Sequence, residues 1–381
     1  MIVDLHAHYP MHLSAASTLA RMTDHHRSGW GDRIRALVLA LANRVANYPA
    51  SGQPAVTVPN LKAGDVGVIL SVLYQPFDEI DLNQPYGAPP LGNYFADLEA
   101  QIAGVERDIA TRFSTDAMVV KNAAQLQAAA TEHKVALIHA VEGGFHLGDT
   151  PERVRANVRR LADLGVAYVT LAHLFWRDVA TNAPALPFLP DWLYGLLFPQ
   201  PSLGLSDLGK AAVDALVEQH ILIDVTHMSQ RALSETFARL DALDPQRQVP
   251  VVASHAAYGF GRLRYNLRDA ELRAIAARRG VVGLIACKHY MSDGLPEPAT
   301  FDESIATICR HIDKIREVTG SHDHVAIGSD LDGFIKPTLP GLETSAAFAA
   351  VEPRLAARYG AGVARQVCSG NALRLLRYWS T

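Results

Sequence analysis

The feature that most constrains the fold of this chain is a series of eight short apolar runs, rich in β-branched residues. They lie at residues 1–6, 66–74, 135–142, 166–173, 221–227, 249–255, 281–287 and 325–330. Runs that are this short and this evenly apolar are typical of strands buried on both faces, as in parallel sheets. The sequence therefore predicts a protein built around a buried parallel sheet.

Helical patterns separate the runs, at residues 150–164, 206–220 and 269–280. Thr150 is a candidate N-cap ahead of Pro151 at the first helical position, and Gly280 is expected to end the third helix. Eight strands with helical crossovers predict an α/β protein of the (β/α)8 TIM-barrel type. A doubly wound open sheet is the alternative. No internal repeat is visible, and we interpret residues 1–381 as a single domain.

Two long segments interrupt this alternation, at residues 11–60 and 174–205. The first contains a helical pattern at residues 32–48. The second is rich in aromatic residues and proline, which makes disorder an unlikely state for it. We interpret residues 174–205 as a lid or pocket wall, with packing against a second subunit of a homodimer as the open alternative.

Composition excludes several classes of protein. Hydrophobic residues make up 49% and charged residues 19% of the 381 residues, which is a globular composition. The net charge is −4 and no long basic stretch is present, so we expect neither nucleic acid nor a membrane surface as partner. Cys287, Cys309 and Cys368 form no CxxC pair, which favours a reducing compartment. With no recognisable signal peptide and no apolar run approaching ~20 residues, we expect a cytoplasmic protein.

Potential metal ligands stand where the predicted strands end. These residues are His6, His8, Glu142, His173, His227, His255 and Asp330. The carboxyl ends of all strands in a barrel open on one face, so side chains far apart in sequence should meet there. A single histidine at a strand end is more often a structural residue than a ligand. Seven such residues at the ends of six strands instead indicate a metal site.

The ligand types suggest a mechanism. Glu142 is the best candidate to bridge two divalent ions, since the glycines that follow it let the backbone approach closely. Asp330 is placed to take a proton from the attacking water and pass it to the leaving nitrogen. His173 is placed to donate a hydrogen bond to the developing oxyanion. Asp332 is interpreted as a turn residue, while Asp4 and Asp224 remain open as turn residues or ligand supports.

Six blocks of sequence resemble the membrane (renal) dipeptidase family of metallopeptidases, a branch of the amidohydrolase superfamily. They are VEGG (141–144), residues 204–229, SHAAY (254–258), residues 264–276, AIGSDLDG (326–333) and GNALRLL (370–376). The resemblance implies a first metal on His6 and His8, a second on His227 and His255, and a bridging Glu142. It assigns Asp330 to the nucleophilic water and His173 to substrate polarisation. It also implies two zinc ions and dipeptide substrates.

The sequence departs from the family pattern in two places. His8 stands where the family usually has aspartate, which makes the site more positive by one charge and bears on metal preference. Tyr265 stands before Asn266, where the family has an arginine that grips the substrate's C-terminal carboxylate. Arg262 and Arg264 lie nearby in sequence and are candidates to take over that contact.

These observations favour a binuclear metal hydrolase that cleaves a dipeptide or an acylated amino acid. Deamination or lactone hydrolysis by a related mechanism is a second hypothesis. A non-catalytic metal-binding member of the family is a third, although a purely structural metal site would need neither Asp330 nor His173.

Overall fold

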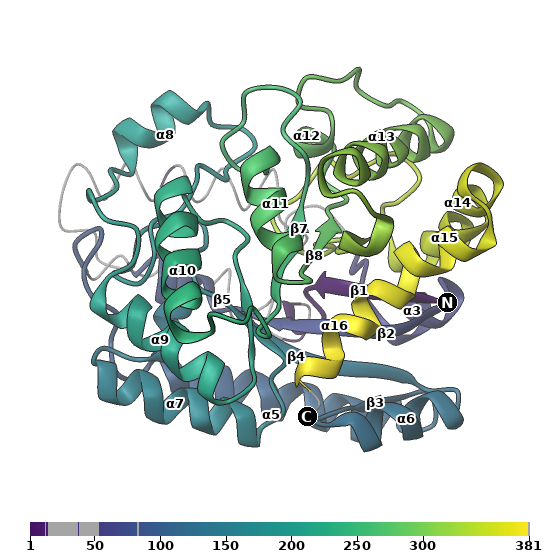
Figure 1. The fold of residues 1–381 in the computed structure, drawn as a ribbon. Helices are drawn as coiled ribbons and strands as arrows, with labels where there is room; N and C mark the ends of the chain where they lie inside the picture. Colours follow the sequence, from purple (N-terminus) through teal and green to yellow (C-terminus); the bar gives the residue numbers. More distant parts are fainter. Residues whose placement is uncertain (12, 14–36, 38–52, 82–83, 380–381) are drawn as a thin grey trace.

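The computed structural model describes residues 1–11, 13, 37, 53–81 and 84–379 of the chain. Its strands lie in the middle of the molecule and helices lie around them (Figure 1). The strands of the described residues are β1 (Ile2–Ala7), β2 (Val66–Leu73), β3 (Ala117–Val119), β4 (Val135–Glu142), β5 (Tyr168–Thr170), β6 (Leu222–Asp224), β7 (Val251–Ala256), β8 (Val281–Leu284) and β9 (Val325–Ile327).

Strand pairing closes the sheet into a barrel. The order is β2-β1-β9-β8-β7-β6-β5-β4-β3, all neighbours are parallel, and β2 also pairs with β4. The eight strands of the closed ring correspond to the eight predicted runs. The (β/α)8 barrel is therefore confirmed, and the open-sheet alternative is wrong. The short β3 was not predicted; it pairs with the first half of β4, from Ala117 opposite Val135.

The longer helices of the described residues alternate with the strands, as a barrel requires. They are α5 (Tyr94–Arg112), α6 (Ala123–Thr131), α7 (Pro151–Asp163), α9 (Asp207–Glu218), α10 (Gln230–Leu243), α11 (Asp269–Ala277), α13 (Phe301–Thr319), α14 (Val351–Tyr359) and α16 (Asn371–Trp379). Shorter helices are α3 (Val58–Ala63), α4 (Pro76–Glu79), α8 (Asp191–Leu197), α12 (Lys288–Met291) and α15 (Ala361–Arg365). The chain ends with α16, which lies across the barrel strands (Figure 1).

The three predicted helices correspond to α7, α9 and α11. The side chain of Thr150 caps α7 by accepting a hydrogen bond from the backbone N–H of Arg153, as expected. The role predicted for Gly280 is wrong. Helix α11 ends at Ala277, and the left-handed residue beyond it is Arg279, with φ of 55°. Gly280 is needed for a different reason, because a Cβ there would collide with the carbonyl oxygen of Val251.

The core has two layers. The inner layer takes apolar side chains from every strand of the barrel, including Leu5, Leu70, Ile138, Leu222 and Val252. The outer layer packs the other strand faces against the helices. This double burial explains why the strands read as continuous apolar runs rather than as alternating ones. No helix among the described residues has both the length and the apolar character to cross a membrane.

The two interruptions lie on the loops that follow β1 and β5. The helix predicted at residues 32–48 lies outside the described residues, apart from residue 37. The 174–205 segment packs beside the end of β6, where the Ala183 N–H donates to the carbonyl oxygen of His227 at 2.7 Å. Tyr194 and Phe198 are buried in it, whereas Trp192 and Leu196 on α8 are each 72% exposed. The segment thus packs beside His227; its interpretation as a lid or pocket wall, and the homodimer, stay predictions.

Candidate active site

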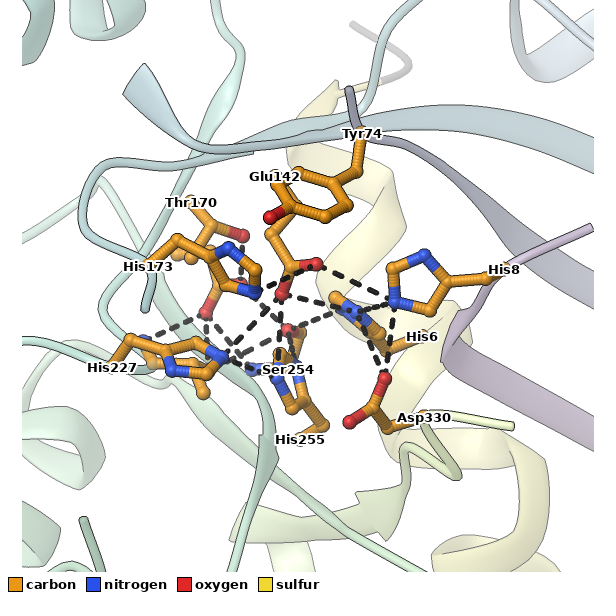
Figure 2. Close-up of polar contacts among 12 residues, drawn as sticks. His6, His8, Tyr74, Glu142, Thr170, His173, His227, Ser254, His255 and Asp330 are labelled. Carbon is orange, nitrogen blue, oxygen red and sulfur yellow. Dashed lines mark hydrogen bonds and ion pairs between the residues drawn. The ribbon is translucent and has the colours of Figure 1, made fainter. Parts of the chain in front are cut away.

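Seven residues predicted from the strand ends meet at one end of the barrel. They are His6, His8, Glu142, His173, His227, His255 and Asp330, and Figure 2 shows their side chains pointing toward a common centre. Each is buried, with Asp330 at 7% the most exposed together with His227. The convergence expected from the barrel geometry is therefore present.

Glu142, the last residue of β4, stands at the middle of this cluster. Its Oε1 lies 3.4 Å from Nε2 of His6 and 3.5 Å from Nε2 of both His227 and His255. Its Oε2 lies 3.4 Å from Nε2 of His8 and 3.3 Å from Nε2 of His173. One carboxylate thus faces five imidazole nitrogens, three at Oε1 and two at Oε2.

The distances from the Glu142 oxygens to the imidazole nitrogens suit a metal site better than a network of hydrogen bonds. Although Glu142 is buried, its Oε1 has no hydrogen-bond partner among the described residues. A buried carboxylate oxygen without a partner is costly, and coordination to a cation removes that cost. The Nε2 atoms of His227 and His255 approach to 2.9 Å, and those of His6 and His8 to 3.3 Å. Such pairs of imidazole nitrogens are the donors that divalent metals prefer.

A hydrogen-bond network supports two of the imidazoles from behind. Nδ1 of His6 lies 2.7 Å from the Tyr168 hydroxyl and 3.0 Å from Ser254 Oγ. The same Ser254 Oγ lies 2.8 Å from Nδ1 of His255. Asp224 anchors the serine, accepting from its hydroxyl at 2.6 Å and from its N–H at 3.0 Å. Partners of this kind orient ligating imidazoles and fix their tautomer.

Asp224 itself lies close enough to His6 and His255 to be a ligand. Its oxygens, however, already accept hydrogen bonds from Ser254, from the Thr170 hydroxyl at 2.6 Å and from the Thr226 hydroxyl at 2.7 Å. We therefore interpret Asp224 as a support rather than a ligand. Asp4 of β1 has a similar supporting role. It accepts hydrogen bonds from the Ser329 hydroxyl at 2.6 Å and from the Ser329 N–H at 2.8 Å, just beyond the end of β9.

His8 and His227 lack such support. Nδ1 of each is buried and has no hydrogen-bond partner in the described part of the chain. Aromatic rings pack around them instead: Tyr265 lies edge-on to His227 at 5.1 Å between centroids, and Tyr74 lies 6.4 Å from His8. His227 also has left-handed backbone, with φ of 65°. Such a conformation costs of order 1 kcal/mol and is often found at functional sites.

Asp330 lies on the same side as His8. Its Oδ1 is 3.1 Å from Nε2 of His8 and 3.7 Å from Nε2 of His6. Its backbone is left-handed as well, with φ of 57°. The turn after it contains Asp332, whose two oxygens accept the N–H groups of Ala55 and Val56, each at 2.9 Å. Asp332 thus holds the backbone at Ala55 and Val56, near the end of the 11–60 segment. The interpretation of Asp332 as a simple turn residue did not include this role.

His173 has a carboxylate partner of its own, Glu79 at the end of α4. Nδ1 of His173 lies 2.7 Å from Glu79 Oε2, while Nε2 faces Glu142. Burial lowers the pKa of the His173 imidazole, but the Glu142 and Glu79 carboxylates outweigh it and raise that pKa to about 9. For Glu142 the signs are reversed. Burial raises the pKa of this carboxyl, but the neighbouring His173 and His6 outweigh burial and hold the pKa well below its usual range.

The predicted substrate-binding residues lie along the loop after β7. The Tyr265 hydroxyl donates to the carbonyl oxygen of His255 at 2.6 Å, and its ring stacks on Tyr290 at 4.1 Å. Asn266 Nδ2 donates to the Tyr290 carbonyl oxygen at 2.9 Å. Arg262 and Arg264 are both exposed. Of the two, Arg264 lines a small cavity beside His227, Tyr265 and Asn266.

Sequence reasoning missed Glu79, Tyr74, Tyr168 and Ser254. Tyr74 directly follows β2. No site residue was predicted for β2 or β8, so the position of Tyr74 at a strand end is a signal that could have identified it. Glu79 has no such signal, because its partner His173 is 94 residues away. Tyr168 and Ser254 lie within apolar runs, and the His6 side chain that both contact is 162 and 248 residues away in the chain, so no local signal marks them.

The comparisons with known proteins point to one family. The model of the membrane dipeptidase family, peptidase family M19, matches residues 1–380. An uncharacterized dipeptidase of Schizosaccharomyces pombe is 30% identical over 231 residues, which are 60% of this chain and 49% of that protein. The chain thus matches about half the length of this curated relative.

Two solved structures of metallopeptidases share the fold. Dipeptidase AC, a metallopeptidase of family M19, has a TM-score of 0.71 at 20% identity, covering 100% of this chain and 99% of that chain. A metallopeptidase from Rhodobacter sphaeroides, solved with a phosphinate mimic of the dipeptide L-Ala-D-Ala, has a TM-score of 0.71 at 19% identity. It covers 99% of this chain and 98% of that chain. At these identities the likeness supports the barrel fold alone.

Proposed function

We propose that this protein, which belongs to the membrane dipeptidase family, is a metal-dependent hydrolase that cleaves a dipeptide or a related amide bond. The observation that carries the proposal is the buried Glu142 carboxylate, whose Oε1 faces the Nε2 atoms of His6, His227 and His255 at 3.4–3.5 Å. A buried carboxylate such as that of Glu142 is stable in a protein interior when it is paired with positive charge.

Two zinc ions would be held by two ligand sets that share Glu142. His6 and His8, which group with Glu142, belong to one set. His227 and His255, whose Nε2 atoms lie 2.9 Å apart, belong to the other. When bound, such ions supply Lewis-acid polarisation of a carbonyl and a nucleophile from water near neutral pH.

The remaining two residues of the cluster handle protons and charge. Asp330 accepts a proton from the attacking water and returns it to the leaving nitrogen, since its side chain is 10% exposed and open to the centre. His173 presents Nε2 to the same centre and donates from it to the oxyanion of the substrate. A purely structural metal site would need neither group, which disfavours a non-catalytic member of the family.

The substrate is proposed to be small and to carry a carboxylate, as a dipeptide or an acylated amino acid does. Lactone hydrolysis and deamination are the alternatives, since the same centre would serve them. Arg264 is the proposed carboxylate contact, because it lines the cavity beside His227 whereas Arg262 does not.

The first test measures metal content and hydrolysis together, on protein purified from zinc-replete cells. The substrates are L-L and L-D dipeptides, N-acyl amino acids and a lactone. About two equivalents of zinc with turnover of an amide would support the proposal. Two equivalents with turnover of the lactone alone would move the protein to the alternative, and absence of bound metal would refute the assignment of all the ligands.

Replacing Asp330 by asparagine tests the proton transfer. Asp330→Asn keeps the size of the side chain and removes its basicity, so bound zinc should persist while kcat falls by about 100-fold or more. Wild-type kcat in this variant would remove Asp330 from the mechanism.

Replacing each loop arginine tests the carboxylate contact. Arg264→Ala should raise KM for a dipeptide by about tenfold, because a charge-assisted hydrogen bond is lost. Arg262→Ala is the matched control and should change KM by less than about threefold. Equal KM values for all three proteins would place the carboxylate contact elsewhere.

A further inference from the structure

Glu79 is a buried carboxylate that no role in the proposed mechanism uses. It is 2% exposed and ends the four-residue helix α4 that follows β2. Three donors converge on it: the Tyr74 hydroxyl at 2.7 Å and His173 Nδ1 at 2.7 Å on Oε2, and the Phe175 N–H at 2.8 Å on Oε1. A buried carboxylate with this many partners is costly to retain unless its geometry serves a purpose.

We propose that Glu79 is the positioning residue of His173, and this inference rests on the proposed function. The carboxylate accepts the Nδ1–H of His173, so Nε2 is the nitrogen that faces Glu142, 3.3 Å away. The ring can then neither flip nor turn away from the substrate. With Nδ1–H held by Glu79, the protonated ring keeps its second N–H at Nε2, the atom that donates to the substrate. A carboxylate that orients an imidazole and stabilises its protonated form plays the same part in hydrolases of unrelated fold.

The surroundings of the ring strengthen this assignment. The Tyr74 ring meets His173 edge-on at 4.5 Å between centroids, and the Tyr74 hydroxyl donates to the same Glu79 oxygen. The Phe175 N–H ties that carboxylate to the strand end that carries His173. Glu79 therefore contacts the side chain of His173 and the backbone two residues on, and both contacts fix the ring relative to the barrel.

The variant Glu79→Gln tests the proposal, because an amide cannot accept at both of its ends. The donors of His173 and Phe175 approach opposite oxygens, so one of them always meets the NH2 group. We expect kcat to fall by about tenfold to a hundredfold, with KM and zinc content unchanged, since Glu79 touches none of the four ligand histidines.

The His173→Ala background separates positioning from a merely structural role. If Glu79 acts through His173, adding Glu79→Gln to His173→Ala should change kcat by less than about threefold. An equal loss of kcat in both backgrounds would overturn the proposal. Asp78→Asn is the matched control: Asp78 is buried on the same helix but pairs with His146, at 3.3 Å, and the variant should keep wild-type kcat.

A spectroscopic measurement tests the same contact without turnover. The hydrogen-bonded Nδ1–H of His173 should give a low-field proton resonance in the NMR spectrum, absent in His173→Ala and lost or shifted upfield in Glu79→Gln. An unchanged resonance in Glu79→Gln would overturn the proposal even if the protein hydrolyses no amide. If wild-type protein lacks hydrolase activity but Glu79→Gln abolishes the resonance, the proposed function fails while the positioning of His173 stands.

Discussion

The four proposed ligand histidines are held in two different ways, and each way occurs once in each proposed metal pair. His6 and His255 share the Ser254 hydroxyl behind them, and Asp224 anchors that serine. His8 and His227 have no hydrogen-bond partner at Nδ1 among the described residues and are held by packing, in the case of His227 against the Tyr265 ring. Each proposed metal therefore has one ligand fixed by hydrogen bonds and one fixed by packing.

This difference follows from where each histidine lies. His6 and His255 belong to β1 and β7, where two hydroxyl groups of the barrel strands, Ser254 of β7 and Tyr168 of β5, lie within reach of their Nδ1 atoms. His8 and His227 lie beyond the strand ends, where the chain already leaves the barrel. The comparison indicates that the barrel wall sets the position of one ligand of each pair, and the loops set the other.

Removing the carboxylate that both pairs of histidines share should have the largest effect. Glu142→Gln keeps the shape of the side chain but cannot bridge two cations, so we expect loss of at least one metal and a fall in kcat of about a thousandfold or more. Elemental analysis after dialysis, together with turnover, would check this. Full metal content would show that the two pairs of histidines hold their ions independently of Glu142.

Removing the hydroxyl behind His6 and His255 should have an intermediate effect. Ser254→Ala leaves the imidazoles in place without their shared partner, and we expect metal affinity to fall by about tenfold to a hundredfold. Chelator competition would measure this. Ser71→Ala is the control, because the buried Ser71 hydroxyl has no partner among the described residues. If both variants bind metal like wild type, the difference between the hydrogen-bonded histidines and the packed ones has no effect on metal affinity.

Changing the ring that packs on His227 should have the smallest effect. Tyr265→Phe keeps the ring and loses only the hydrogen bond to the His255 carbonyl, which should lower the free energy of unfolding by about 1 kcal/mol. Tyr265→Ala also removes the ring and should weaken metal binding by about tenfold. Urea unfolding and chelator competition measure the two effects. If Tyr265→Phe loses as much metal affinity as Tyr265→Ala, the Tyr265 hydroxyl and not its ring supports metal binding by His227.

Much of the fold could be predicted because its signals are local. Each buried strand of a barrel reads as an apolar run of its own, and Thr150 caps α7 through a hydrogen bond three residues away. The strand β3 was missed because only three residues pair, against a strand that has other partners. The role of Gly280 was misjudged because its constraint is the carbonyl oxygen of Val251, distant in sequence.

The same division holds for the site. The strand-end positions of the histidines and carboxylates could be predicted from the sequence, because each strand and its site residue are adjacent along the chain. The folded structure was needed to show that Glu142 faces all four of the paired histidines, that Ser254 supports one of each pair, and that Glu79 contacts His173. The physical reason is range: hydrogen bonds act over about 3 Å in space, and their partners here are 94 and 248 residues apart in the chain.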